Sequence, residues 1–185
     1  MGASQSGHIA AVGYDMFLKL MQESVAELKG VPVRAPLDPE ININLSAFIP
    51  ANYIPDIDQR MAAYRRLARM TELKEIADFK TELIDRYGKP PAEANNLLFK
   101  IMLKILSQKA GISRLDLVGP QMHLQFSHAH LKNTEALVDM IQAAPGRYEL
   151  TPGSILKVKL ANAQNCSPRG QAKNILKDII ERVKN

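Results

Sequence analysis

Few residues in this sequence have the chemistry to bind a metal or act as a nucleophile. His128 and His130 share a face if the chain there is extended, and His123 lies just upstream. Three imidazoles are a conceivable zinc ligand set, but no cysteine or carboxylate in the immediate neighbourhood completes or supports it. The single cysteine, Cys166, precedes a helix cap with no histidine near it in sequence, which favours a structural role over a reactive thiol. We therefore predict no metal site.

Four arginines form the densest basic cluster of the chain. They lie on one predicted helix, at Arg60, Arg65, Arg66 and Arg69. Guanidinium groups bind phosphates well, which makes this helix a candidate nucleic-acid surface. A run of arginines on one helix is more often a solvated face paired with nearby acids. Both interpretations stay open from sequence.

A second cluster is acidic. Helical spacing places Glu82 and Asp85 three residues apart on one side of a helix, with Arg86 beside them. Paired carboxylates act as general acid and base only in a desolvated cleft, and nothing in the sequence indicates one. Glu82 and Arg86 have the spacing of an i,i+4 surface ion pair worth about 0.3–0.5 kcal/mol. The alternative is an acidic patch that docks on a partner protein.

Motifs for nucleotide binding and hydrolysis are absent from the sequence. No G-x-x-x-x-G-K-[ST] loop occurs, and neither does G-x-S-x-G or H-E-x-x-H. We therefore predict that the chain is not an enzyme and holds no cofactor.

The composition is that of a globular protein, with 46% hydrophobic and 23% charged residues. No apolar run approaches the roughly 20 residues that span a bilayer, and the N-terminus lacks the features of a signal peptide. We expect a cytoplasmic protein that binds no membrane. The net charge of +5 resides at one end, because seven basic residues and two acidic ones follow Gly153. An electrostatic partner of this basic excess would meet the last segment.

Hydrophobic periodicity divides the chain into three parts. Residues 8–29 have the pattern of an amphipathic helix, so residues 1–30 are predicted to be a separate helical segment. Residues 31–39 contain three prolines and are predicted to be an extended linker. Residues 40–185 are predicted to be one domain.

The predicted domain mixes helices and strands. Residues 41–45 alternate as a strand, and three helices follow in series, capped at Asp56, at Thr71 and by Pro90 and Pro91. Two strands joined at Gly119 come next. A helix over 131–141, strands near 148–150 and 155–160, and a last helix beginning at Ser167 complete the pattern. We predict an α+β fold with a small, mainly antiparallel sheet covered by helices.

Three motifs in these helices resemble a known family. They are Phe48-Ile49-Pro50 with Tyr53-Ile54-Pro55-Asp56, then Arg60-Met61 with Tyr64-Arg65-Arg66, then the run Glu82 to Pro91. In this order and spacing they resemble the C-terminal domain of the bacterial transcription-repair coupling factor family, Mfd. Residues 2–17, which include Gln5, Ser6 and Gly7, resemble the motif at the exit of the RecG-like DNA translocase motor.

The resemblance implies a function for the chain. The family's parent protein recognises stalled RNA polymerase, moves along duplex DNA with an ATP-driven motor and recruits the repair protein UvrA. Its C-terminal domain is regulatory: it docks on the parent's own UvrA-binding module and masks that module. ATP and Mg²⁺ would then act only in motor lobes that this chain lacks. The resemblance gives no role to His128 or His130.

Two functions from different classes follow from these observations. The leading hypothesis is an autoinhibitory protein-interaction domain that uses Glu82, Asp85 and Arg86. The alternative is a nucleic-acid-binding module that uses the basic helix or the C-terminal tail. The absence of tryptophan leaves few platforms on which bases stack, which disfavours the alternative.

Overall fold

The computed structural model describes residues 37–127, 134–151, 155–161 and 167–184. Within these ranges the chain forms two compact units, which we describe separately. The first unit contains residues 45–101, and the second contains residues 37–44 and the described residues from Met102 onward. The predicted first helix, most of the proline-rich linker, Gln5, Ser6, Gly7, His128, His130 and Cys166 lie outside the described residues.

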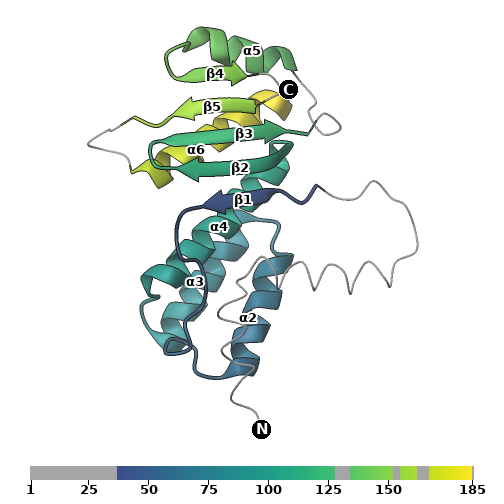
Figure 1. Cartoon of the computed structure of the whole chain (residues 1–185). Coiled ribbons are helices and arrows are strands. Elements are labelled where there is room, and N and C mark those ends of the chain that lie inside the picture. Colours follow the sequence, from purple (N-terminus) through teal and green to yellow (C-terminus); the bar gives the residue numbers. More distant parts are fainter. Residues whose placement is uncertain (1–36, 128–133, 152–154, 162–166, 185) are drawn as a thin grey trace. The chain divides into compact units, whose positions relative to one another are not determined.

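The first unit is helical. Its helices are α2 (Ile57–Arg69), α3 (Leu73–Tyr87) and the N-terminal part of α4 (Ala92–Lys109) (Figure 1). Apolar residues at helical spacing form its core. They include Tyr64, Leu67, Ile76, Phe79, Leu83, Leu97 and Ile101, each no more than 9% exposed. Burial of these side chains supplies the main stabilisation of such a helical unit.

The helix ends follow local capping chemistry. Asp56 caps α2, because its Oδ1 accepts the Gln59 N–H at 2.8 Å. The predicted cap of α3 at Thr71 is one residue early. Glu72 is the N-cap, and the Glu75 carboxylate accepts the backbone N–H groups of both Thr71 and Glu72. Gly88 ends α3 with φ +79°, a conformation that favours glycine.

The second unit contains a five-stranded sheet in the order β1-β2-β3-β5-β4. The strands are β1 (Glu40–Ile43), β2 (Ile112–Val118), β3 (Gln121–Phe126), β4 (Tyr148–Thr151) and β5 (Ile155–Lys159). Only β1 and β2 pair in parallel, and the three other pairings are antiparallel. The described residues therefore confirm the predicted α+β fold with a mainly antiparallel sheet.

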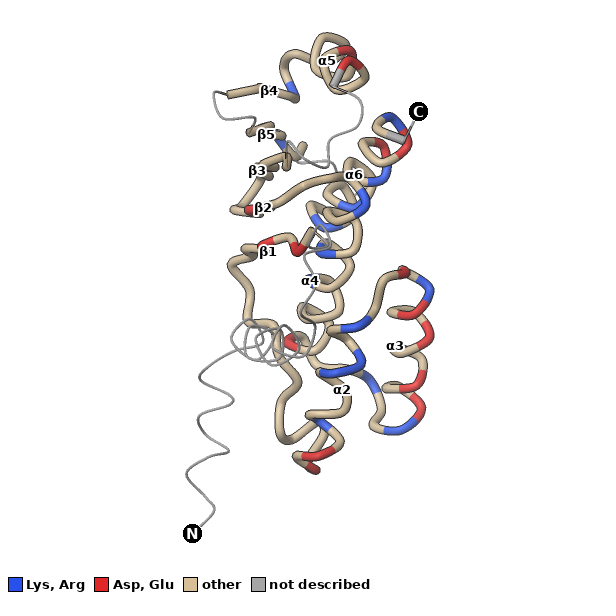
Figure 2. Tube along the Cα trace, turned by 90° about the vertical axis from the view of Figure 1, so that its right-hand side faces the viewer, with Lys and Arg blue, Asp and Glu red and all other residues tan. Residues whose placement is uncertain are grey.

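Helices lie on one side of this sheet. The strand positions that face them are buried, for example Leu115, Leu124 and Leu156, each no more than 1% exposed. Figure 2 shows α6 (Pro168–Lys184) along that side, and α5 (Thr134–Ala143) contacts both α6 and β4. Ser167 caps α6 as predicted, since its Oγ accepts the Gly170 N–H at 3.2 Å. Alternate strand positions place polar and charged side chains on the opposite face of the sheet.

Candidate protein-interaction site on helices α2 and α3

An acidic stripe follows one side of α3. It consists of Glu75, Asp78, Glu82 and Asp85, whose spacing of three, four and three residues places them in one row on the helix. Figure 2 shows acidic residues along the length of this helix. Asp78 and Asp85 are exposed and make no ion pair with a residue that the structure describes.

Glu82 differs from its neighbours in the stripe, because two arginines hold it. The Arg66 guanidinium on α2 donates to Glu82 Oε2, and Arg86 Nη1 lies 3.3 Å from Glu82 Oε1. The Arg66 guanidinium also lies 4.9 Å from the centroid of the buried Phe79 ring. Hydrogen bonding and charge from Arg66, followed by those from Arg86, hold the pKa of Glu82 below its usual value. The side chain is therefore fixed between the two helices.

Gln59 extends this cluster along α2. Its Oε1 accepts hydrogen bonds from Arg86 Nη2 at 3.3 Å and from the Tyr87 hydroxyl at 2.5 Å. We call Gln59, Arg66, Glu82 and Arg86 the α2–α3 clamp. The clamp ties the C-terminal half of α3 to α2, and Asp85 lies on the same segment without taking part in it.

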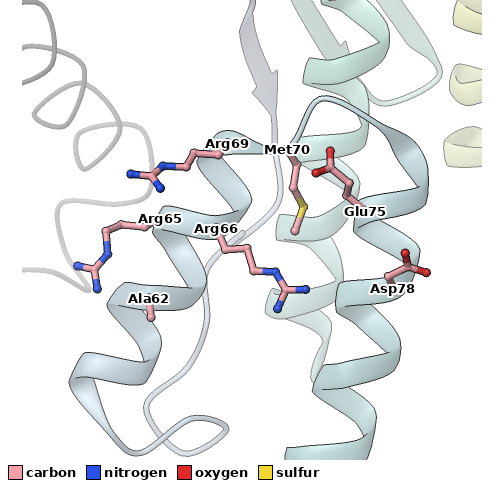
Figure 3. Close-up of a pocket in the computed structure, with 7 residues that line it drawn as sticks. All are labelled: Ala62, Arg65, Arg66, Arg69, Met70, Glu75 and Asp78. Carbon is pink, nitrogen blue, oxygen red and sulfur yellow. The ribbon is translucent and has the colours of Figure 1, made fainter.

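The four candidate arginines have three different surroundings. Arg60 donates to the backbone carbonyls of Ile54 and Pro55, at 2.6 and 2.9 Å. Arg66 belongs to the clamp. Arg65 and Arg69 are exposed, and Figure 3 shows them extending to the side away from α3, whereas Arg66 extends toward it.

A depression of about 440 Å³ lies between α2 and α3. Ala62, Arg65, Arg66, Arg69, Met70, Glu75 and Asp78 line it. Arginines of the basic helix and acids of the stripe thus border the same surface, and the charges partly neutralise each other.

Several motif residues hold the unit together. Tyr64 is 7% exposed, and its hydroxyl accepts the Ile49 N–H at 2.7 Å. The Tyr53 hydroxyl lies 3.1 Å from the Leu83 carbonyl and 2.9 Å from the Gly88 carbonyl. Burial raises the pKa of both tyrosines, because the loss of water around the hydroxyl disfavours the charged phenolate. The motif residues therefore stabilise the fold of this unit and also contribute to its surface.

The sequence analysis did not predict these hydrogen bonds between the two tyrosines and the backbone, because it used Tyr53 and Tyr64 only as parts of the family motifs. One signal was available for Tyr64, because a buried tyrosine hydroxyl normally finds a hydrogen-bond partner. No pattern identifies Gln59, whose partners lie 27 and 28 residues away. Of the predicted interface residues, Glu82 and Arg86 meet in the clamp and Asp85 stays separate.

The structure adds two observations on metal and membrane binding. Within the described ranges, no group of three His, Cys, Asp or Glu side chains has the arrangement of a metal site. His123, the one histidine of the zinc ligand set considered above that lies in these ranges, is on β3. No described helix is long and apolar enough to cross a membrane.

Comparisons with known proteins define the class to which this fold and these motifs correspond. The family model of the TRCF domain matches residues 43–137, just over half of the chain, so the chain belongs to this domain family. A solved structure described as the C-terminal domain of transcription-repair coupling factor has the same fold, with a TM-score of 0.63 and 19% identity. The match covers 80% of this chain and 94% of that one.

The relatives identify the protein from which such a domain comes. A transcription-repair-coupling factor of Myxococcus xanthus is 30% identical over 182 residues, which is 97% of this chain and 15% of the relative. One from Rickettsia bellii is 39% identical over 118 residues, which is 63% of this chain and 10% of the relative. The resemblance predicted from the motifs is confirmed. The chain spans 15% or less of the length of these two relatives.

Proposed function

We propose that this chain is the regulatory domain of a transcription-repair coupling factor and acts by autoinhibition. It docks on the parent's own UvrA-binding module and masks it until the ATP-driven translocase engages stalled RNA polymerase. The chain needs no cofactor for this role, and ATP and Mg²⁺ act in the motor lobes of the parent. Family membership and the resemblance of the motifs support this proposal.

The observation that carries the proposal is the exposed carboxylate of Asp85 beside the α2–α3 clamp. Two cations already neutralise Glu82, whereas Asp85 has no cation among the described residues. A basic surface on the module would supply one. The clamp fixes the helix that carries Asp85, so docking orders little additional structure. A charged contact of this kind is also reversible, which suits a surface that must later be released.

The test is UvrA binding by the full-length resting parent. We expect Glu82→Ala with Asp85→Ala to increase the amount of UvrA retained, because the mask is weakened. Asp139→Ala is the matched control, since Asp139 is an exposed aspartate on α5. Retention of UvrA at the wild-type level by the double variant would remove these two carboxylates from the interface.

A second function is favoured by one observation. Arg65 and Arg69 extend away from the acidic stripe and are exposed, which leaves them able to contact phosphates. As a nucleic-acid module the chain would bind duplex DNA through these residues and the C-terminal lysines. Because such binding rests on counterion release, it should weaken steeply between about 50 and 200 mM salt. Submicromolar affinity that persists at about 0.2 M salt would favour this second function over docking.

A further inference from the structure

A row of polar side chains crosses the open face of the sheet. Register places Asn42, Asp116, His123, Lys157 and Glu149 side by side on the five strands. Neighbouring strands lie about 4.8 Å apart, so each of these side chains is within reach of the next. Asn42 Nδ2 donates to Asp116 Oδ1 at 2.6 Å, and Lys157 Nζ lies 3.9 Å from Glu149 Oε1.

The basic part of this row borders a cavity of about 400 Å³. Four basic groups line it, from β3, β5 and the turn before β4. They are His123, Lys157, Lys159 and Arg147, and Glu149 is the one acidic residue in the lining. Lys159 and Arg147 make no ion pair with any residue in the described ranges. The lining of the cavity is therefore predominantly basic.

His123 adds an observation independent of the charge count. Its Nε2 is buried and has no hydrogen-bond partner within the described part of the chain. Buried polar side-chain atoms in folded proteins nearly always have a partner, so an unpartnered one calls for an explanation. His123 also lines the cavity, so a turn of its ring would bring this enclosed nitrogen to an anion bound there.

The charges around the cavity limit the size of the anion. Asp116 borders His123 on the β2 side, and Glu149 borders Lys157 on the β4 side. Beyond Asp116, β1 adds Glu40, whose carboxylate lies 3.7 Å from Arg114. An extended polyanion crossing the sheet would meet these carboxylates on both sides. A compact anion in the cavity would meet the four basic groups and a single carboxylate, that of Glu149, which already pairs with Lys157.

We propose that this cavity binds a small phosphorylated molecule through its phosphate group. The lysines supply charge, Arg147 supplies a planar guanidinium suited to two phosphate oxygens, and a turn of the His123 ring would give its Nε2 the partner that it lacks. The volume falls within the range of about 300–1,000 Å³ that is usual for small-molecule sites. The site is separate from the acidic stripe and does not depend on the docking function.

The test is a titration of the ¹⁵N-labelled 185-residue chain with inorganic phosphate, followed by amide chemical shifts. Ionic strength is held constant with chloride, because general screening would otherwise mimic binding. We expect saturable shifts at the amides of His123, Arg147, Lys157 and Lys159. Lys157→Gln with Lys159→Gln should weaken the binding at least tenfold, and Arg147→Gln should weaken it as well.

A matched control removes two lysines elsewhere. Lys173→Gln with Lys177→Gln changes α6 by the same charge and should leave phosphate binding unaltered. Shifts that do not saturate, or that the α6 control reduces as much as the cavity variants, would overturn the proposal. A single-stranded oligonucleotide that shifts the same amides at lower concentration than phosphate would identify a nucleic-acid site instead and also overturn it.

Discussion

Tyr64→Phe tests whether the family motifs hold the first unit together. The substitution keeps the aromatic ring, so it leaves no cavity in the core, but it removes the hydroxyl that accepts the Ile49 N–H at 2.7 Å. Ile49 is 4% exposed and Tyr64 is 7% exposed, so water does not readily replace the lost acceptor. A buried N–H that loses its partner costs about 1–3 kcal/mol. We expect a loss of this size in the free energy of unfolding.

The assay is urea denaturation of the 185-residue chain, followed by far-ultraviolet circular dichroism. The midpoint should fall without a change in slope, since the surface exposed on unfolding stays the same. Tyr87→Phe is the matched control, because it removes an exposed hydroxyl that bonds to Gln59. Surface changes of this kind stay within about 0.5 kcal/mol. Equal, small effects of the two substitutions would refute the structural role of Tyr64.

Two further predictions concern α3. Glu82→Gln should lower the free energy of unfolding by about 0.2–1 kcal/mol at pH 7, the usual range for exposed ion pairs. Because the pKa of Glu82 is lowered from 4.5 in the folded state, this contribution is present above that value and is lost as the pH falls through the folded pKa. Wild type and variant should therefore converge as the pH is lowered, and a difference that does not shrink as the pH falls below 4.5 would contradict the ion-pair explanation. Gly88→Ala should destabilise by about 1–3 kcal/mol, because φ +79° with ψ −167° suits glycine alone even though no atom blocks a Cβ there. A circular dichroism melt at the wild-type temperature would show that this helix end tolerates a side chain.

Local pattern was sufficient to predict most elements of the described fold. Helical spacing and caps predicted α2 and α3, and period-2 alternation around Gly119 predicted β2 and β3, because these signals involve residues close in sequence. The boundaries of α3 and β1 differ from the prediction by one or two residues, because the ends of helices and strands are the least sharply defined parts of these elements. The parallel pairing of β1 with β2 was not predictable, since alternation shows that a segment is a strand but not which strand it joins.

The candidate site was predictable only in part for the same reason. The pair Glu82–Arg86 has a recognisable i,i+4 spacing, and the structure places the two groups 3.3 Å apart. Arg66 lies 16 residues from Glu82 on another helix, so its contact depends on how α2 packs on α3. The basic cavity depends likewise on the register of three strands, which brings His123 beside Lys157. Contacts that arise from tertiary packing leave no recognisable pattern in a single sequence.

The central claim is that the acidic side of α3 masks the UvrA-binding module of the parent. The most direct test is the affinity of the full-length resting parent for UvrA, compared among wild type, Asp85→Lys and Asp139→Lys. A partly desolvated charge pair contributes about 1.5 kcal/mol or more, which corresponds to roughly tenfold in affinity. We predict that Asp85→Lys tightens UvrA binding by at least about tenfold while Asp139→Lys leaves it unchanged. Equal affinities of all three proteins for UvrA would contradict the claim.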